Sequence, residues 1–313
     1  MSRILVIGDL IIDKFVYGTV SRISPEASVP ILNITRSFTL LGGASNVARI
    51  LGALGYDVKL VSMVPQEDYP LVKHLVPERV LFSTISAAAY RVPVKTRFIS
   101  VFRNAHILRA DEEFCPTGPG VQMTEKDLGS LLSLVDEAEL ILVSDYNKGF
   151  LDSDTIAKII SRARGKARKV ILDSKKKDDA GFAGAYMYKP NRFEFDIITN
   201  RVHDPSISLE GAARDLLNRR KIDYLFLTLG EDGCIVLDRK MGNVFRCASR
   251  STNIVEVSGA GDSVLAALAI GEVQGRDIGQ TATLAMELAA ITTSYSPSDI
   301  DGLMEAYKEY FAS

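Results

Sequence analysis

Short apolar runs with the length of buried β-strands recur along the chain. They show little polar alternation, which is typical of strands covered on both faces, as in a parallel sheet. These runs cover residues 4–7, 58–64, 140–143, 170–172, 224–229 and 234–237. Helical patterns lie between several of them, at residues 45–54, 154–164, 209–218 and 262–273. The alternation predicts an α/β fold: a doubly wound, mostly parallel sheet flanked by helices.

Two segments depart from this alternation, at about residues 14–39 and 91–111. Both are rich in β-branched and aromatic residues, as in KTRFI at residues 95–99. Such a composition, mixed with polar residues, is typical of half-exposed strands, and we expect them to be antiparallel and to lie outside the main sheet. We therefore predict a single domain over residues 1–313, with a small β-sheet lid inserted into it. A lid of this size is marginally stable alone.

Composition narrows the class of protein. The chain is 47% hydrophobic and 24% charged, with a net charge of −2, so it gives no reason to expect a nucleic-acid or membrane partner. Its three cysteines, Cys115, Cys234 and Cys247, form no CxxC pair, which favours a reducing compartment. No apolar run reaches the roughly 20 residues of a bilayer span, and the first residues lack a signal-peptide pattern. We therefore expect a cytoplasmic protein.

The segment richest in chemistry is residues 256–263, EVSGAGDS, which precede an apolar helical pattern. Gly259 and Gly261 allow a tight turn whose amides can approach an anion, and a helix N-terminus favours negative charge there. Asp262 would repel a bound phosphate, but it suits a base that accepts a proton from an attacking hydroxyl. For an isolated GxGD motif, a turn with an N-cap aspartate would be the preferred interpretation.

Other segments give the motif its context. SGAGD at residues 258–262 and LGGASNVA at residues 41–48 resemble the two signatures of the ribokinase-like sugar kinases. Further sequences similar to family motifs are DYNKG at 145–149, DSK at 173–175, PNRFE at 190–194 and TLGEDG at 228–233. The resemblance implies an ATP-dependent carbohydrate kinase that uses Mg²⁺. A Rossmann dehydrogenase is excluded, because no GxGxxG follows the first apolar run.

One branch of that family is more similar. SRISPEASVP at residues 21–30 resembles the lid of bacterial D-glycero-β-D-manno-heptose 7-phosphate kinases, and residues 95–111 match the same branch. The resemblance implies phosphorylation of the anomeric hydroxyl to the 1,7-bisphosphate, in nucleotide-activated heptose synthesis. We expect the stand-alone kinase form, without a nucleotidyltransferase domain. Related kinases often pair their lids across a two-fold axis, so the resemblance also implies a homodimer through the β lids. A kinase for another sugar, sugar phosphate or nucleoside stays open, as does a non-catalytic sugar or nucleotide binder.

The resemblance implies roles for individual residues. Asp262 is the expected base, and the amides of Gly259, Ala260 and Gly261 form an anion hole. The expected sugar contacts are Asp13, Gly42, Gly43, Asn46, Arg103, Asn104, Lys95 and Arg22. The expected ATP contacts are Asn191, Lys175, Thr228, Gly230, Gly233 and Ser258. Glu194 and Asn191 are expected to hold Mg²⁺, partly through water.

Several of these residues have structural alternatives. Asn46 could cap a helix, and Asn191 with Glu194 could form a capping box. The basic lid residues could serve solubility and edge protection. His106 is expected to be a lid or interface residue and not a base.

Several positions depart from the family pattern, among them residues 64–68, VPQED, where the family usually has G-x-D. Glu256 stands where an aspartate helps to organise a monovalent cation, so the requirement for that cation stays open. Met286 stands where an asparagine lies near the adenine, and the turn at residues 293–297 lacks its usual glycine. The resemblance therefore leaves the adenine contacts undefined.

Overall fold

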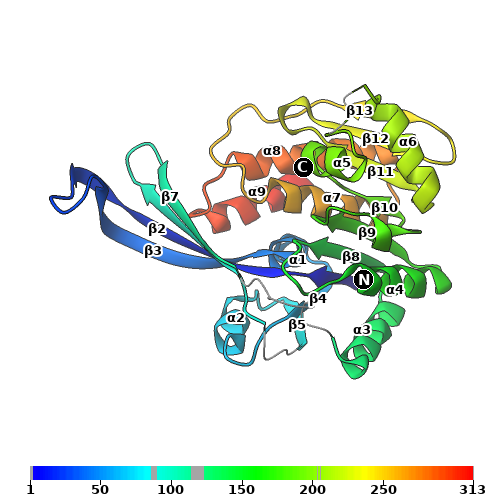
Figure 1. Ribbon diagram of the computed structural model, residues 1–313, viewed down its shortest axis with the longest axis horizontal. Helices are drawn as coiled ribbons and strands as arrows, with labels where there is room; N and C mark the ends of the chain where they lie inside the picture. Colours follow the sequence, from blue (N-terminus) through cyan, green and yellow to red (C-terminus); the bar gives the residue numbers. More distant parts are fainter. Residues whose placement is uncertain (1–2, 86–89, 114–122, 203, 205, 313) are drawn as a thin grey trace.

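The computed structural model describes residues 3–85, 90–113, 123–202, 204 and 206–312, so Cys115 lies outside the described residues. Within them, nine strands form the main sheet in the order β13-β12-β11-β10-β9-β8-β1-β4-β5 (Figure 1). The strands are β1 (Arg3–Gly8), β4 (Asp57–Met63), β5 (Val80–Ile85), β8 (Leu140–Asp145), β9 (Lys169–Ser174), β10 (Met187–Tyr188), β11 (Tyr224–Thr228), β12 (Cys234–Asp238) and β13 (Val244–Cys247).

The predicted parallel sheet is confirmed from β11 to β5, and only β12 and β13 pair antiparallel at one edge. In β1, Val6 and Ile7 are both fully buried although their side chains point to opposite faces. Helices must therefore cover both faces of the sheet. Cys234 and Cys247 lie opposite each other across β12 and β13, and both thiols are free.

The helices of the described residues are α1 (Ala44–Ala53), α2 (Tyr69–Leu75), α3 (Glu125–Glu137), α4 (Ser153–Gly165), α5 (Arg192–Ile198), α6 (Leu209–Arg220), α7 (Ala260–Val273), α8 (Ile278–Thr293) and α9 (Ile300–Ala312). Helix α7 contacts α1 and α8, and α3 contacts α4. Because α7 is apolar all round, it is buried along most of its length. In the described ranges, no helix is long and apolar enough to cross a bilayer.

The predicted lid is a separate four-stranded sheet in the order β3-β2-β6-β7. Its strands are β2 (Leu10–Ile23), β3 (Pro30–Gly43), β6 (Val94–Ser100) and β7 (Ala105–Glu112). The first hairpin is longer than predicted. The expectation of antiparallel strands holds within each hairpin but is wrong between them, because β2 pairs parallel to β6. Both strands run outward from the main body, so they share a direction (Figure 1).

The lid has a small core of its own. Phe15, Tyr17 and Ile99 are buried there, and Phe38 stacks on both aromatic rings. Other apolar side chains of the lid stay exposed: Val20, Ile23, Val29, Ile34, Val101, Phe102 and Leu108. So few buried residues give the lid little stability by itself.

Candidate active site

Two cavities adjoin at the carboxyl ends of the parallel strands, where ligands bind in open α/β sheets. The first, here called the lid cavity, has a volume of about 380 Å³ and is walled by the lid and the loop before α7. The second, the outer cavity, has a volume of about 470 Å³ and lies beside β9, β10 and β11. Both are lined by Tyr146, Lys175, Asn191, Val257 and Gly261. A group bound at this boundary can be reached from either cavity.

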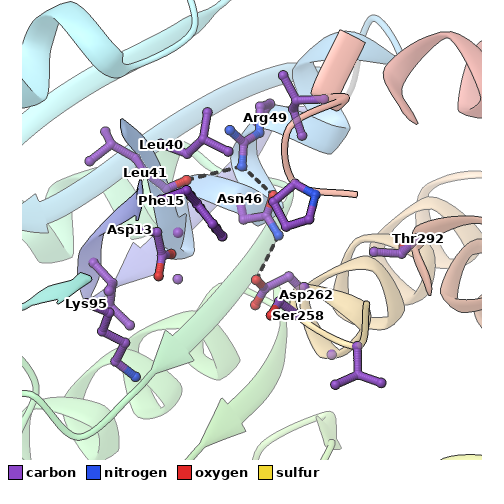
Figure 2. Close-up of a pocket in the computed structure, with 18 of the residues that line it drawn as sticks. Asp13, Phe15, Leu40, Leu41, Asn46, Arg49, Lys95, Ser258, Asp262 and Thr292 are labelled. Atoms are coloured by element: carbon purple, nitrogen blue, oxygen red, sulfur yellow. Dashed lines mark hydrogen bonds between the residues drawn. The ribbon is translucent and has the colours of Figure 1, made fainter. Parts of the chain in front are cut away.

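Asp262 lies in the first turn of α7, and its side chain faces the lid cavity (Figure 2). The residue is only 4% exposed. Its Oδ1 accepts a hydrogen bond from the Tyr146 hydroxyl at 2.6 Å, and its Oδ2 accepts one from Asn46 Nδ2 at 2.9 Å. The N-cap is Gly259, with φ of 84°, so the interpretation of Asp262 as an N-cap is wrong. A Cβ on Gly259 would lie 2.9 Å from Asn46 Nδ2, which requires glycine there.

The environment of Asp262 sets its charge. Burial raises the pKa of its carboxyl group, while the hydrogen bonds from Tyr146 and Asn46 lower it. Asn46 does not cap α1, because its side chain is used elsewhere. It accepts a hydrogen bond from Arg49 at 2.5 Å while it donates to Asp262.

The lid contributes one acidic and two basic side chains to its cavity: Asp13, Lys95 and Arg97. Asp13 accepts a hydrogen bond from Arg97 at 2.5 Å, and Gly42 packs directly against the Asp13 carboxylate. Lys95 also lines the cavity, and within the described residues it makes no hydrogen bond or ion pair. Burial and the nearby Lys148 lower its pKa. The cavity therefore offers a cation that is free to bind an anionic group.

Some predicted sugar contacts lie elsewhere. Arg22 is exposed near the outer end of β2, and Arg103 with Asn104 form the exposed turn between β6 and β7. None of the three lines either cavity. Ser258, predicted to contact ATP, lines the lid cavity and donates its hydroxyl to Glu256 at 2.8 Å. Gly42, Gly43 and Asn46 do line the lid cavity, together with Asp13 and Lys95.

The predicted ATP contacts other than Ser258 all line the outer cavity. It is lined by Lys175, Asn191, Glu194, Thr228, Gly230, Gly233, Ala260 and Gly261. Its remaining wall is largely apolar and includes Met286, which is 5% exposed, and Ile254. An aromatic base can pack on such a wall, while phosphates can reach the loop amides and Lys175.

The polar side of the outer cavity has the donors that Mg²⁺ prefers. Asp173, Asn191 and Glu194 line it together. Burial and the Asp173 charge raise the pKa of Glu194, while the charges of Lys189 and Lys175 act in the opposite direction. Asn191 and Glu194 form the capping box as well, which leaves each side chain a further oxygen lone pair. In the described ranges no cluster of three His, Cys, Asp or Glu side chains could hold a metal, so phosphates and water would complete the Mg²⁺ shell.

Comparison with known proteins identifies the family. The model of the pfkB family carbohydrate kinases matches residues 1–301. The chain belongs to the pfkB family of carbohydrate kinases. It is 35% identical over 307 residues to the bifunctional protein HldE of Nitrobacter winogradskyi and 33% identical over 310 residues to that of Nitrobacter hamburgensis. Each match covers 97% of this chain but only 62% of the relative.

Solved structures agree with this assignment at the level of fold. Phosphofructokinase-2 from Escherichia coli, in complex with potassium, matches with a TM-score of 0.76 and 18% identity, over 100% of this chain and 99% of that one. Ribokinase from Arabidopsis thaliana, complexed with ribose and ATP, matches with a TM-score of 0.70 and 16% identity, over 98% and 99%. At such identities the likeness shows the fold alone, and it confirms the predicted architecture.

Three residues of this pfkB kinase were not assigned a role from the sequence. Tyr146 stands in the recognised DYNKG motif, but its spacing gave no sign of a contact with Asp262. Arg49 had no signal apart from its place on the helix after the glycine motif. Lys189 directly precedes the PNRFE motif, is 3% exposed, and pairs with Asp173 at 2.8 Å in the outer cavity.

Proposed function

We propose that this pfkB kinase transfers the γ-phosphoryl group of ATP to the anomeric hydroxyl of D-glycero-β-D-manno-heptose 7-phosphate, giving the 1,7-bisphosphate. The observation that carries the proposal is the boundary between the two cavities. Gly261 and Lys175 line both cavities, and Asp262 faces the lid cavity beside them. A sugar in the lid cavity and ATP in the outer cavity would meet at these residues.

In the proposed reaction, the sugar hydroxyl gives its proton to Asp262 as its oxygen bonds to the γ-phosphorus. The bond between that phosphorus and the bridging oxygen breaks, and ADP leaves with the electron pair. The amides of Gly259, Ala260 and Gly261, together with Lys175, would stabilise the negative charge that develops on the transferred group. Mg²⁺, when bound, would neutralise charge on the ATP phosphates. Glu194, Asn191 and Asp173 would hold it, while Thr228, Gly230 and Gly233 would lie along the nucleotide.

The sugar-phosphate acceptor is supported by the charges of the lid cavity. Lys95 is available for a phosphate, whereas Asp13 and the amides near Gly42 and Gly43 suit sugar hydroxyls. The heptose in particular is supported by the resemblance of residues 21–30 to heptose 7-phosphate kinases and by the identity with the HldE proteins. A pfkB kinase for another sugar phosphate is the second candidate, because Lys95 would serve it equally well.

Purified protein should be assayed for ADP release with heptose 7-phosphate, fructose 6-phosphate, ribose and fructose. We expect the highest kcat/KM with the heptose phosphate. Clear turnover of another sugar without turnover of the heptose phosphate would refute the substrate assignment. Lys95→Met should raise KM for a phosphorylated sugar about tenfold and leave KM for ATP unchanged. Lys14→Met, on the neighbouring strand β2 and outside both cavities, is the matched control.

Asp262→Asn tests the base. The amide keeps the size of the side chain but accepts no proton at neutral pH, so kcat should fall by about 10²–10⁴. ATP binding, measured by calorimetry, should stay within a few-fold of the original protein. Unchanged turnover in this variant would show that Asp262 is not the base. A non-catalytic binder would bind ATP without turnover in either protein.

We also propose that the protein is a homodimer joined through its lids. The exposed apolar residues of the lid need a partner surface, and Arg22, Arg103 and Asn104 do not line the lid cavity of their own chain. Paired lids would cover this apolar surface. Light scattering should give twice the chain mass, and Ile34→Glu should shift it to the monomer. A monomeric mass for the unaltered protein would exclude the dimer.

A further inference from the structure

The carboxylate of Asp262 is held from both sides by segments that are distant in sequence. Tyr146, in the loop between β8 and α4, donates to Oδ1, and Asn46, from α1, donates to Oδ2. Asn46 is fixed in turn by Arg49, which also donates to the Leu41 carbonyl at 3.1 Å (Figure 2). Arg49 therefore holds the Asn46 side chain that contacts Oδ2, whereas Oδ1 is contacted by the hydroxyl of Tyr146.

The position of Tyr146 is itself fixed. Its backbone N–H donates to Asp9 Oδ2 at 2.8 Å, and the N–H of Lys148 donates to the same oxygen at 3.2 Å. Asp9 is fully buried, so this anchor is shielded from water. On the other side, the Lys175 ammonium lies 3.5 Å from the centre of the Tyr146 ring, a cation–π contact. The ring is thereby held between the two cavities with its hydroxyl on Asp262.

The Tyr146 hydroxyl donates a hydrogen bond to the ionised form of the buried Asp262 carboxylate and so stabilises its charge. Burial raises the pKa of the Tyr146 hydroxyl well above its usual range, so it remains a donor at all working pH values. An ionised carboxylate has about four lone-pair positions, of which Tyr146 and Asn46 use two. The remaining positions can accept the proton of a sugar hydroxyl. The other charged or titratable groups whose charges act on Asp262 are Arg49, Asp173, Lys175, Lys189 and Tyr307.

We infer that Tyr146 is a positioning residue for the proposed base, and that its hydroxyl orients the Asp262 carboxylate and keeps it ionised when the substrate is bound. This inference rests on the proposed function, because it needs Asp262 to act as a base. The phenol takes no proton from the substrate in this account. It acts through Asp262 alone, so its loss should change the pH dependence and kcat more than the binding of ATP.

Tyr146→Phe removes only the hydroxyl. Without that donor the Asp262 carboxyl should hold its proton to a higher pH, so the acidic limb of the kcat/KM profile should move upward by about one unit. At neutral pH kcat should fall about 10–100-fold, with KM for ATP within about twofold. Tyr188→Phe is the matched control, because the Tyr188 hydroxyl is buried without a hydrogen-bond partner among the described residues and its ring packs on Phe182. Its profile should match that of the original protein.

The outcomes separate the inference from the proposed function. If the original protein phosphorylates a sugar and Tyr146→Phe keeps both the acidic limb and kcat, the positioning role is refuted while the kinase remains. If the original protein phosphorylates no sugar, the proposed function fails and the inference fails with it. A second measurement does not depend on turnover. The melting temperatures of Tyr146→Phe, Asp262→Asn and the double variant are compared with that of the original protein. If the hydroxyl acts on the carboxylate, the two shifts in melting temperature should not add in the double variant, and additive shifts would overturn the contact.

Discussion

Replacing Lys189 with methionine would leave the Asp173 carboxylate without its partner inside the protein. The two side chains are 4% and 8% exposed, and Nζ lies 2.8 Å from Oδ2. At an effective dielectric constant of about 20, their attraction is about 6 kcal/mol before desolvation is subtracted. Removing one member of a buried pair costs about 3–5 kcal/mol in practice, because the remaining charge is desolvated and uncompensated. We therefore expect the melting temperature to fall by roughly 6–10 °C.

The double variant Lys189→Met/Asp173→Asn removes both charges and should recover most of the lost stability, since two neutral groups of similar size replace the pair. Turnover should not recover, because both residues line the outer cavity. Differential scanning fluorimetry and an ADP-release assay on the single and double variants measure the two effects separately. Recovery of stability together with full turnover would show that the pair is structural only.

An exposed pair provides the control. Lys308 pairs with Glu305 at 3.0 Å on α9, with side chains 51% and 62% exposed. Solvent screens such a pair, so Lys308→Met should change stability by less than about 1 kcal/mol. If Lys189→Met destabilises the protein no more than Lys308→Met does, the reasoning from burial is wrong.

Glu256→Ala removes the acceptor of three hydrogen bonds in the loop before α7, from the amides of Val257 and Ser258 and from the Ser258 hydroxyl. The loop should become less ordered, so kcat should fall about tenfold in the ADP-release assay. An unchanged kcat would show that Glu256 does not order this loop. Burial raises the pKa of Asp179, but the hydrogen bonds from Arg219 and Arg220 lower it by more, so the net shift is downward. A carboxylate with a lowered pKa stabilises the folded state above its unfolded pKa near 4, and this stabilisation is lost at lower pH. Asp179→Asn should therefore lower the melting temperature at pH 7, and the difference from the original protein should shrink below about pH 4. Gly42→Ala would place a Cβ 2.2 Å from Asp13 Oδ2 and should raise KM for the sugar, whereas Gly129→Ala, in open space on α3, should be tolerated or stabilise by about 0.5–1 kcal/mol. Equal sugar KM values for the two glycine variants would contradict that contact.

Local pattern was enough to predict most of the fold. The apolar run at residues 4–7 became β1, and the helical pattern at residues 209–218 became α6, because strand and helix periodicity depend on near neighbours. Short elements escaped prediction. β10 has only two residues, so it is too short to show any period. The parallel pairing of β2 with β6 also escaped, because strand direction depends on where each hairpin leaves the main sheet.

The amino-acid sequence contains the chemical groups of the candidate site: a glycine turn with Asp262, a PNRFE segment and a basic lid. Which of these groups meet depends on how distant elements pack. Asn46 and Asp262 are 216 positions apart and are joined because α1 packs against α7. Tyr146 and Lys189 enter the site because neighbouring parallel strands end at one edge of the sheet. Such contacts depend on how whole elements pack, and no local spacing records that. For the same reason Arg103, similar in type to Lys95, lies at the lid turn while Lys95 faces the cavity.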